Sequence, residues 1–310
     1  MELRQLRYFV AIVDHGALSR AALVLHVAQP ALTQQLRQLE DELGTKLLHR
    51  SAQGVLSTDA GKVFYQHAQA ILKQVADARA AVTQSATRPS GSVTLGLPHS
   101  ISGALALPLL LAARARYPEI TLQLTEELSG NLTEQLRAGR INLAVLFDDG
   151  QLGQFATSAL IDEQLAFLCR ADAPSAGAGP ITLADALATT LILPVQQQGV
   201  RPRIERVARE AGLALGEIIE INSIAILQSA ILAGMGATIL PVAPLQADIA
   251  RGAICARPIT SPALARSVTL CASKAIPLTN AATAIEALVL AVTRELCESG
   301  AWPGAQLPQI

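Results

Sequence analysis

Five side chains between residues 29 and 37 have the types and spacing to contact the edges of DNA bases. They fall on one face of a predicted helix, and they are Gln29, Pro30, Thr33, Gln34 and Arg37. A glutamine amide can pair with adenine, a guanidinium with guanine or a phosphate, and a threonine methyl can contact thymine. The acidic residues 40–42 come only near the end of the helix, away from the turns that would enter a groove. The alternative, a merely solvated polar face, does not require the first turns to lack acidic residues.

Three predicted helices position these side chains. The first ends at Gly16, a residue type that adopts the left-handed conformation found after helices. We expect Ser19 to cap a short second helix, residues 27–29 to form a tight turn, and Pro30 to take the first position of the third helix, where its missing N–H costs nothing. The buried stripe of the third helix is Leu32, Leu36, Leu39 and Leu43. Two helices joined by so short a turn are typical of a helix-turn-helix.

Residues 45–50 and 54–57 have the composition of two short strands around a glycine-containing turn. Such a hairpin after the third helix is a β-wing. Lys46 and Arg50 would then face phosphates or the minor groove. The fold predicted for residues 1–57 is therefore an all-α winged helix-turn-helix.

Residues 58–87 form one long periodic stretch without proline, which predicts a long linker helix capped by Thr58. Apolar residues at alternating spacings of three and four form a seam: Phe64, Ala68, Ile71, Val75, Ala78 and Val82. A heptad pattern sustained over this length indicates a partner helix, so we expect the seam to pair two copies of the chain. The alternative is a long helix that packs on its own chain.

The remainder of the chain predicts an α/β domain with two lobes. Residues 88–91 have the composition of a hinge. Strands and helices then alternate as βαβαβ up to residue 147, and a similar run spans residues 190–240. The predicted segments are lobe I at 92–161 and 267–299, lobe II at 162–266, and a loop-like or disordered tail at 300–310.

Open α/β sheets bind ligands beyond the carboxyl ends of their strands. In lobe I this rule selects residues 98–102, which precede a helix whose free N–H groups, together with serine hydroxyls, suit a carboxylate or another anion. In lobe II it selects Gln197, in a loop after a strand, and Ser223, at the start of a helix. Simple helix capping or loop solvation is the alternative for each of these residues.

The consecutive blocks at residues 6–10, 16–22, 28–36, 39–44, 47–50 and 58–61 resemble the signature of LysR-type transcriptional regulators. The resemblance implies a winged helix-turn-helix and a two-lobed, periplasmic-binding-protein-like effector domain. The five side chains from Gln29 to Arg37 match the recognition-helix positions, and Arg50 matches the wing arginine. Gln53 stands where the family commonly carries a second basic residue, so the wing contact is expected to be weaker.

The resemblance also implies effector contacts and partners. Ser100 best matches a family position that contacts the effector, Ser102 is the second choice, and Ser129 matches another such position. The implied partners are double-stranded DNA at an interrupted palindrome, a small effector such as an organic anion, further copies in a dimer or tetramer, and RNA polymerase. The blocks at 8–14, 24–30, 59–62 and 220–225 resemble the nitrogen assimilation control subgroup, which implies a weak or absent response to an effector.

Composition argues against several other classes of protein. With 51% hydrophobic and 16% charged residues the chain is globular, and its net charge of −1 hides a small positive excess in residues 1–88. No signal peptide is apparent, and the longest apolar run, 101–113, is shorter than the roughly 20 residues that span a bilayer. We therefore expect a cytoplasmic protein without a membrane partner. An exported solute-binding protein, one rival, would need a signal and would not need residues 1–57.

An enzyme is the other rival. Neither a nucleophile elbow nor a phosphate loop occurs in the sequence, so no catalytic constellation, cofactor or metal site is expected. The spacings of Cys169, Cys255, Cys271 and Cys297 suit neither zinc nor a disulfide framework, and we expect buried, reduced thiols.

Overall fold

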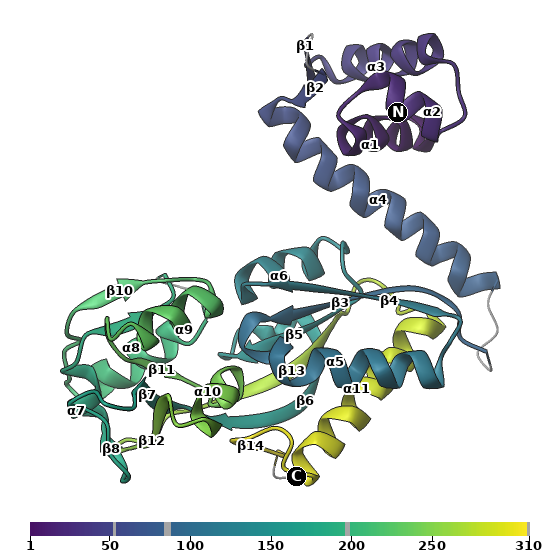
Figure 1. Ribbon diagram of the computed structural model, residues 1–310. Coiled ribbons are helices and arrows are strands. Elements are labelled where there is room, and N and C mark those ends of the chain that lie inside the picture. Colours follow the sequence, from purple (N-terminus) through teal and green to yellow (C-terminus); the bar gives the residue numbers. More distant parts are fainter. Residues whose placement is uncertain (52–53, 84–87, 196–198, 309–310) are drawn as a thin grey trace. The chain divides into compact units, whose positions relative to one another are not determined.

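The computed structural model describes residues 1–51, 54–83, 88–195 and 199–308 (Figure 1). The chain divides into two compact units, the first formed chiefly by residues 1–83 and the second by residues 84–137 and 141–310. Within the described ranges, no helix has the length and apolar character needed to cross a membrane.

The first unit begins with three helices, α1 (Leu3–His15), α2 (Leu18–Val24) and α3 (Gln29–Leu43). Gly16 ends α1 in the left-handed conformation, at φ 62°, as predicted. The N-cap of α2 is Ala17, so the prediction that Ser19 caps this helix is wrong, because the helix starts one residue before it. Helix α3 likewise starts earlier than predicted, at Gln29, and Pro30 lies in its first turn. The core of the unit joins α1 to α3 through Leu6, Phe9, Ile12, Leu32, Leu36 and Leu39.

The wing and the linker helix follow. Strands β1 (Leu48–Ser51) and β2 (Gly54–Ser57) pair antiparallel, with Leu48 opposite Ser57. Helix α4 (Asp59–Thr83) has 25 residues, which at 1.5 Å per residue is about 37 Å. The hydroxyl of Thr58 accepts a hydrogen bond from the N–H of Gly61 at 2.9 Å, so Thr58 caps α4 as predicted. Residues 84–87, the end of the predicted linker, lie outside the described residues.

Lobe I is a six-stranded sheet in the order β14-β6-β13-β5-β3-β4. Its strands are β3 (Gly91–Pro98), β4 (Ile120–Glu127), β5 (Leu143–Asp148), β6 (Phe155–Gln164), β13 (Ala265–Ser273) and β14 (Ala305–Gln306). Helices α5 (His99–Arg116), α6 (Ser129–Arg137) and α11 (Asn280–Glu298) pack on it. Strand β3 runs parallel to β4 and β5, as the predicted βαβαβ order requires, whereas β13 is antiparallel to its neighbours.

Lobe II combines a four-stranded sheet, β11-β7-β12-β8, with the parallel pair β10-β9. Its strands are β7 (Ala166–Arg170), β8 (Ile181–Thr182), β9 (Leu191–Leu193), β10 (Ile218–Glu220), β11 (Thr238–Leu240) and β12 (Ile254–Thr260). The helices are α7 (Leu183–Leu187), α8 (Arg201–Glu210), α9 (Ile224–Leu232) and α10 (Gln246–Ala250). Short 3₁₀ turns lie at Leu152–Gln154 and Ala243–Leu245.

The chain passes between the lobes twice, from β6 to β7 and from β12 to β13. Strand β6 stays in the sheet of lobe I through Gln164, and β13 re-enters that sheet at Ala265. Both strands therefore extend slightly beyond the predicted limits of lobe I, 161 and 267.

The described C-terminal segment packs on lobe I: residues 299–304 form turns and bends, as a loop requires, but the segment is not a disordered end. Trp302 is 1% exposed, and its indole N–H donates to the carboxylate of Glu163 at 3.0 Å. Strand β14 then pairs with β6, with Ala305 opposite Glu163. A buried indole needs a partner for its N–H, and this partner lies 139 residues earlier in the chain.

Candidate functional site

The side chains predicted to contact bases are brought together on α3. Gln29, Pro30, Thr33, Gln34 and Arg37 line one shallow surface depression, and we call this set the reading face. Four of them are exposed and Thr33 is half-buried. Within the described part of the chain, no side chain of the five makes a hydrogen bond or ion pair, so their polar groups are available to an external partner.

The opposite side of α3 fixes its position. Leu32, Leu36 and Leu39 are at most 2% exposed and pack on α1 and α2. Truncating a buried leucine of this kind costs about 2–5 kcal/mol. The reading face is therefore presented by a rigid helix.

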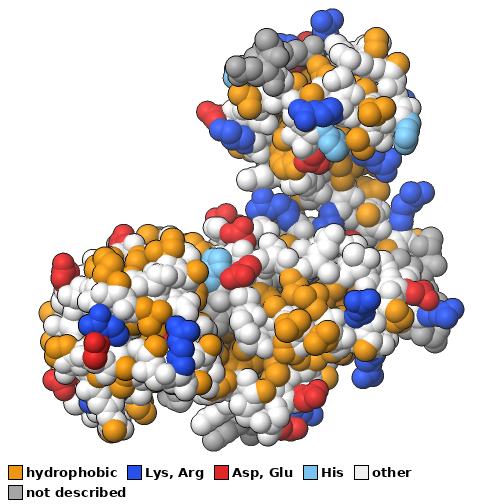
Figure 2. Space-filling model, in the orientation of Figure 1, with side chains coloured by type: hydrophobic (Ala, Val, Ile, Leu, Met, Phe, Trp, Pro, Cys, Tyr) orange, Lys and Arg blue, Asp and Glu red, His pale blue; other side chains and the backbone are white. Residues whose placement is uncertain are grey.

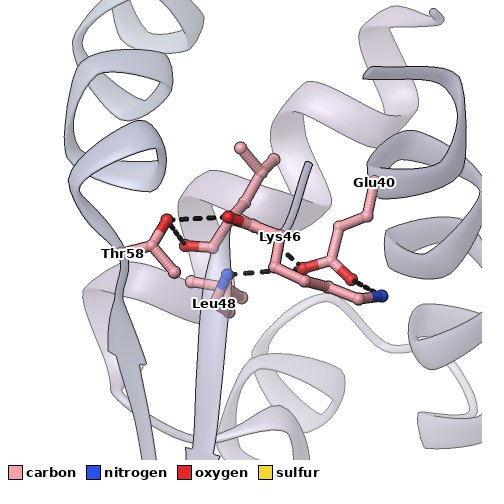
Figure 3. Close-up of polar contacts among 5 residues, drawn as sticks. Glu40, Lys46, Leu48 and Thr58 are labelled. Atoms are coloured by element: carbon pink, nitrogen blue, oxygen red, sulfur yellow. Dashed lines mark hydrogen bonds and ion pairs between the residues drawn. The ribbon is translucent and has the colours of Figure 1, made fainter. Parts of the chain in front are cut away.

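The end of α3 is tied to the wing by a buried carboxylate (Figure 3). Glu40 Oε1 accepts hydrogen bonds from the N–H groups of Leu47 and Leu48 at 3.0 and 3.3 Å, and Oε2 accepts one from Lys46 Nζ at 2.8 Å. Burial alone would raise the pKa of Glu40, but Lys46 and the two N–H groups more than offset this effect and hold the pKa below its usual value. The Thr58 hydroxyl donates to the carbonyl oxygens of Lys46 or Leu47 at 2.8 and 3.1 Å, so the same corner also holds the start of α4.

The three residues predicted to contact DNA from the wing differ in their surroundings. Lys46, expected to face phosphate, has its ammonium paired with Glu40, although its side chain is 67% exposed. Arg50 lies in β1, opposite Val55. Gln53 lies outside the described residues.

The predicted seam of α4 divides into two parts. Ala68 is fully buried and Phe64 half-buried in the core of the first unit, and the Phe64 ring contacts that of Phe9 edge-on at 5.1 Å. These two residues pack on their own chain, which is the alternative to pairing with a second copy. Ile71 and Val82 remain 38% and 84% exposed, so the unpartnered part of the seam begins near residue 71.

A cleft between lobes I and II holds two of the five effector residues predicted from the sequence. It has a volume of about 50 Å³ and is partly open to solvent, and we call it the interlobe cleft. The first turns of α5, α6, α8 and α9 border it, and Pro98, Leu128, Phe147, Val200 and Ile224 give it a largely apolar wall. Ser100 and Ser129 line it. An apolar cleft with a few polar groups at helix starts is typical of small-molecule sites.

The polar wall of the interlobe cleft is built around Arg266, which sequence reasoning missed. Its Nη2 donates to the Ser100 hydroxyl at 2.8 Å and to Glu163 Oε2 at 2.7 Å, and its Nε donates to the same oxygen at 2.9 Å. Its guanidinium lies over the Phe147 ring, 4.0 Å from the centroid. Burial lowers the pKa of Arg266, and the Glu163 carboxylate opposes that effect. The Ser100 hydroxyl is therefore already bound by a guanidinium within the same chain.

The other predicted effector residues do not all reach the cleft. Helix α5 starts at His99, so Ser100 and Ser102 lie in its first turn and not in a loop, and Ser102 donates back to the His99 carbonyl at 3.1 Å. The Ser223 hydroxyl caps α9 by accepting from the N–H of Ile226 at 3.4 Å, the structural alternative considered for it. Gln197 lies outside the described residues.

Two family models match the chain. Residues 3–62 match the bacterial regulatory helix-turn-helix protein, lysR family, and residues 86–294, more than half of the chain, match the LysR substrate binding domain. The nitrogen assimilation regulatory protein nac of Escherichia coli (strain K12) is 36% identical over 299 residues, which cover 94% of this chain and 95% of that protein. This similarity confirms the resemblance to the nitrogen assimilation subgroup.

Solved structures share the fold. Full-length OxyR from Pseudomonas aeruginosa has a TM-score of 0.71 at 23% identity, covering 100% of this chain and 99% of that one. Full-length CbnR complexed with its target DNA has a TM-score of 0.55 at 23% identity, covering 94% and 100%. The chain therefore belongs to the LysR family of bacterial DNA-binding transcriptional regulators, with an N-terminal helix-turn-helix and a substrate-binding domain.

Proposed function

We propose that two copies of this chain bind an interrupted palindrome through their reading faces and regulate transcription there. The observation that supports the proposal most strongly is the reading face itself. It offers two amides, a hydroxyl and a guanidinium on an exposed helix, without partners among the described residues and without a carboxylate among them. Those groups are the ones that read base edges in the major groove. A regulator of bacterial genes works in the cytoplasm, where the DNA lies, and needs no catalytic residues.

Self-association is proposed to use two surfaces. The exposed part of the seam on α4, from Ile71 to Val82, would pair two linker helices. In the second unit, α5 carries the exposed side chains of Leu107, Leu110 and Leu111, and hydrophobic side chains gather over this helix in Figure 2. Contiguous exposed apolar surface indicates association. A dimer of dimers built through both surfaces could change DNA bending and contact with RNA polymerase.

The interlobe cleft is proposed to bind a small organic anion. Helix starts and the hydroxyls of Ser100 and Ser129 support this ligand class. The Glu163 carboxylate, however, already neutralises Arg266, so an anion must compete with it. If no anion binds, the cleft instead belongs to a regulator that works without an effector, as the resemblance to the nitrogen assimilation subgroup suggested.

A gel-shift titration tests DNA recognition. The probe is the DNA upstream of the chain's own gene, and the variant is Gln34→Ala/Arg37→Ala. The control Gln246→Ala/Arg209→Ala removes the same residue types from exposed positions of the second unit. We expect specific retardation to be lost in the first variant and kept in the control. Equal binding by both variants, or no specific retardation by the wild type at low salt, would overturn the proposal.

A thermal-shift screen with small carboxylates tests the cleft. Wild type should be stabilised by a binding anion, and Ser129→Ala should reduce that stabilisation, because the hydroxyl lines the cleft. The matched control is Ser229→Ala, an exposed serine on α9 that does not line the cleft. Stabilisation by no carboxylate would favour the regulator that works without an effector.

A further inference from the structure

Two of the four cysteines lie directly opposite each other in lobe II. Strands β7 and β12 are antiparallel neighbours (Figure 1), and their register places Cys169 opposite Cys255. Two residues further along, the N–H of Ala171 donates to the carbonyl of Ala253 at 3.0 Å, so the cysteines also occupy a hydrogen-bonded position of the ladder. Cα atoms at such positions are about 5.5 Å apart. Disulfides span Cα separations of roughly 4.4–6.8 Å, so the backbone permits a bond here.

The two thiols share one face of the sheet but differ in access. Cys169 is 1% exposed, whereas Cys255 is half-buried. The Cys255 thiol donates to the carbonyl oxygen of Gly177 at 3.2 Å, and the Gly177 N–H lies 3.5 Å from the Cys255 sulfur. Cys255 therefore holds the connection between β7 and β8, residues 171–180, against β12.

A cation lies on the same face. Arg257, two residues after Cys255 in β12, donates to the carbonyl oxygens of Ser175, Gly179 and Pro180, each at 2.8 Å. Exposure is one of the properties that make a thiol susceptible to oxidation, and it distinguishes Cys255 from the buried Cys169. Cys255 and Arg257 thus both attach loop 171–180 to β12.

The buried thiol, that of Cys169, is the less reactive of the two. Burial raises the pKa of Cys169; the Ser175 hydroxyl lowers it in part, and the neighbouring Cys255 thiol adds to the increase. Cys169 is therefore poorly suited to attack an oxidant in solution but well placed to attack the sulfur of an oxidised Cys255.

We propose that Cys169 and Cys255 form a dithiol site that small hydroperoxides oxidise to a disulfide. The Cys255 thiolate attacks one peroxide oxygen, the O–O bond breaks, and the departing oxygen takes up a proton to leave as water or an alcohol. Cys255 is then a sulfenic acid. The Cys169 sulfur loses its proton and attacks the Cys255 sulfur, the S–O bond breaks, and the hydroxide leaves with that proton as water. The two thiols lose two electrons and the peroxide gains two.

Oxidation changes one defined contact. The bond forms between strands that are already paired, so the sheet keeps its register. Cys255 loses the S–H group that it donates to Gly177, and one of the attachments that hold loop 171–180 is removed. The oxidation state of Cys169 and Cys255 is thereby coupled to the order of loop 171–180 on the surface of lobe II.

The other two cysteines provide matched controls. Cys271 lies opposite Thr157 and Ala144 in the sheet of lobe I, and burial, with a smaller effect of Asp148, raises its pKa to about 12. Cys297 lies in α11, where burial raises its pKa. Neither has a cysteine opposite it in a sheet, and both should react slowly.

The test uses the full-length chain, reduced and then freed of reductant. A few equivalents of hydrogen peroxide should remove two of the four thiols, measured after denaturation, and dithiothreitol should restore them. Peptide mapping should find a Cys169–Cys255 link within one chain. Hydrogen exchange in residues 173–180 should increase on oxidation.

Three variants make the assignment specific. Cys169→Ser should leave a sulfenic acid on Cys255 that dimedone traps. Cys255→Ser should neither lose thiols to hydrogen peroxide nor be labelled by dimedone. Cys271→Ser/Cys297→Ser should still lose both remaining thiols. Thermal unfolding of each reduced variant shows whether it is folded, and alanine replaces serine where it is not. Retention of all four thiols by the wild type, a link between other cysteines, or loss of oxidation in the double variant would overturn the proposal.

Discussion

Arg266 and Glu163 form an ion pair inside lobe I, 2.7 Å long, with the two side chains 6% and 0% exposed. Each partner has a further role: Arg266 binds the Ser100 hydroxyl in the interlobe cleft, and Glu163 accepts the indole N–H of Trp302. The chain of contacts from Ser100 to Trp302 joins the effector side of α5 to the C-terminal segment. Any ligand that binds Arg266 therefore acts on a network that extends across the lobe.

Removing the negative charge by Glu163→Gln should strongly destabilise the second unit. An uncompensated buried charge costs about 3–5 kcal/mol when its partner is removed. Trp302 is the only tryptophan of the chain and contacts Glu163, so its fluorescence during urea unfolding measures the loss directly.

A double-mutant cycle separates the ion pair from simple packing. Glu163→Gln/Arg266→Met should be less destabilised than the sum of the two single variants, because the double variant leaves no unpaired charge. The exposed Glu210→Gln is the control and should stay within about 0.5 kcal/mol of wild type. Additive effects in the cycle would show that the pair is not coupled.

Trp302→Phe tests the attachment of the C-terminal segment. Phenylalanine keeps most of the apolar volume but removes the indole N–H, so Glu163 loses one of its donors. A buried acceptor that loses its partner costs about 1–3 kcal/mol. Circular dichroism during thermal unfolding should show a lower melting temperature, whereas Leu307→Ala, at a partly exposed position of the same segment, should have a smaller effect. A melting temperature equal to that of wild type would mean that this hydrogen bond is not required.

The sequence predicts the elements with local signals better than those with distant partners. Gly16 after α1 and the Thr58 cap of α4 each depend on neighbours within a few residues, and the structure confirms them. Of the four leucines predicted to form the buried stripe of α3, Leu32, Leu36 and Leu39 are buried. Leu43 is 38% exposed, so its predicted burial is wrong, because it is the last residue of the helix. The sequence predicts too late a start for α5, because Gly103 and the serines before it suggest a loop, whereas the helix begins directly after Pro98.

The effector site was predicted only in part for a related reason. Ser100 and Ser129 follow strands, and the rule for open α/β sheets finds them in the cleft. Arg266 and Glu163 lie in two strands 103 residues apart, and neither has a local signal that would pair it with the other. The same holds for Trp302, whose burial depends on a carboxylate in β6.

Glu40→Gln should lower the stability of the first unit in a pH-dependent way. Glu40 has a folded pKa below its usual value of 4.5, so the unfolded chain binds the proton more readily and stability falls as pH decreases. The stabilising effect of the carboxylate is fully present above the unfolded pKa and is lost as pH falls through the folded pKa. At pH 7 the variant should be less stable by about 1–3 kcal/mol, because three donors lose a charged acceptor.

Urea unfolding at a series of pH values from 7 to 3 measures this effect. The difference between wild type and Glu40→Gln should shrink in the acid range, once the carboxyl is protonated in both states. Asp41→Asn, an exposed neighbour on the same helix, should show little pH-dependent difference. A difference for Glu40→Gln that is constant over the whole range would contradict the assignment of the lowered pKa to these contacts.

Ile71→Asp/Val82→Asp should separate two copies of the chain without unfolding either one. Both side chains are exposed in the single chain, so the charges cost little there, but they would be buried without partners in a paired seam. Light scattering coupled to size exclusion should show a smaller species, and affinity for the palindromic site should fall because only one reading face then binds at a time. Ala76→Asp, an exposed position of α4 outside the seam, is the matched control and should keep the wild-type assembly. If Ile71→Asp/Val82→Asp also keeps that assembly, the linker helix does not pair the subunits, and association must depend on another surface such as that of α5.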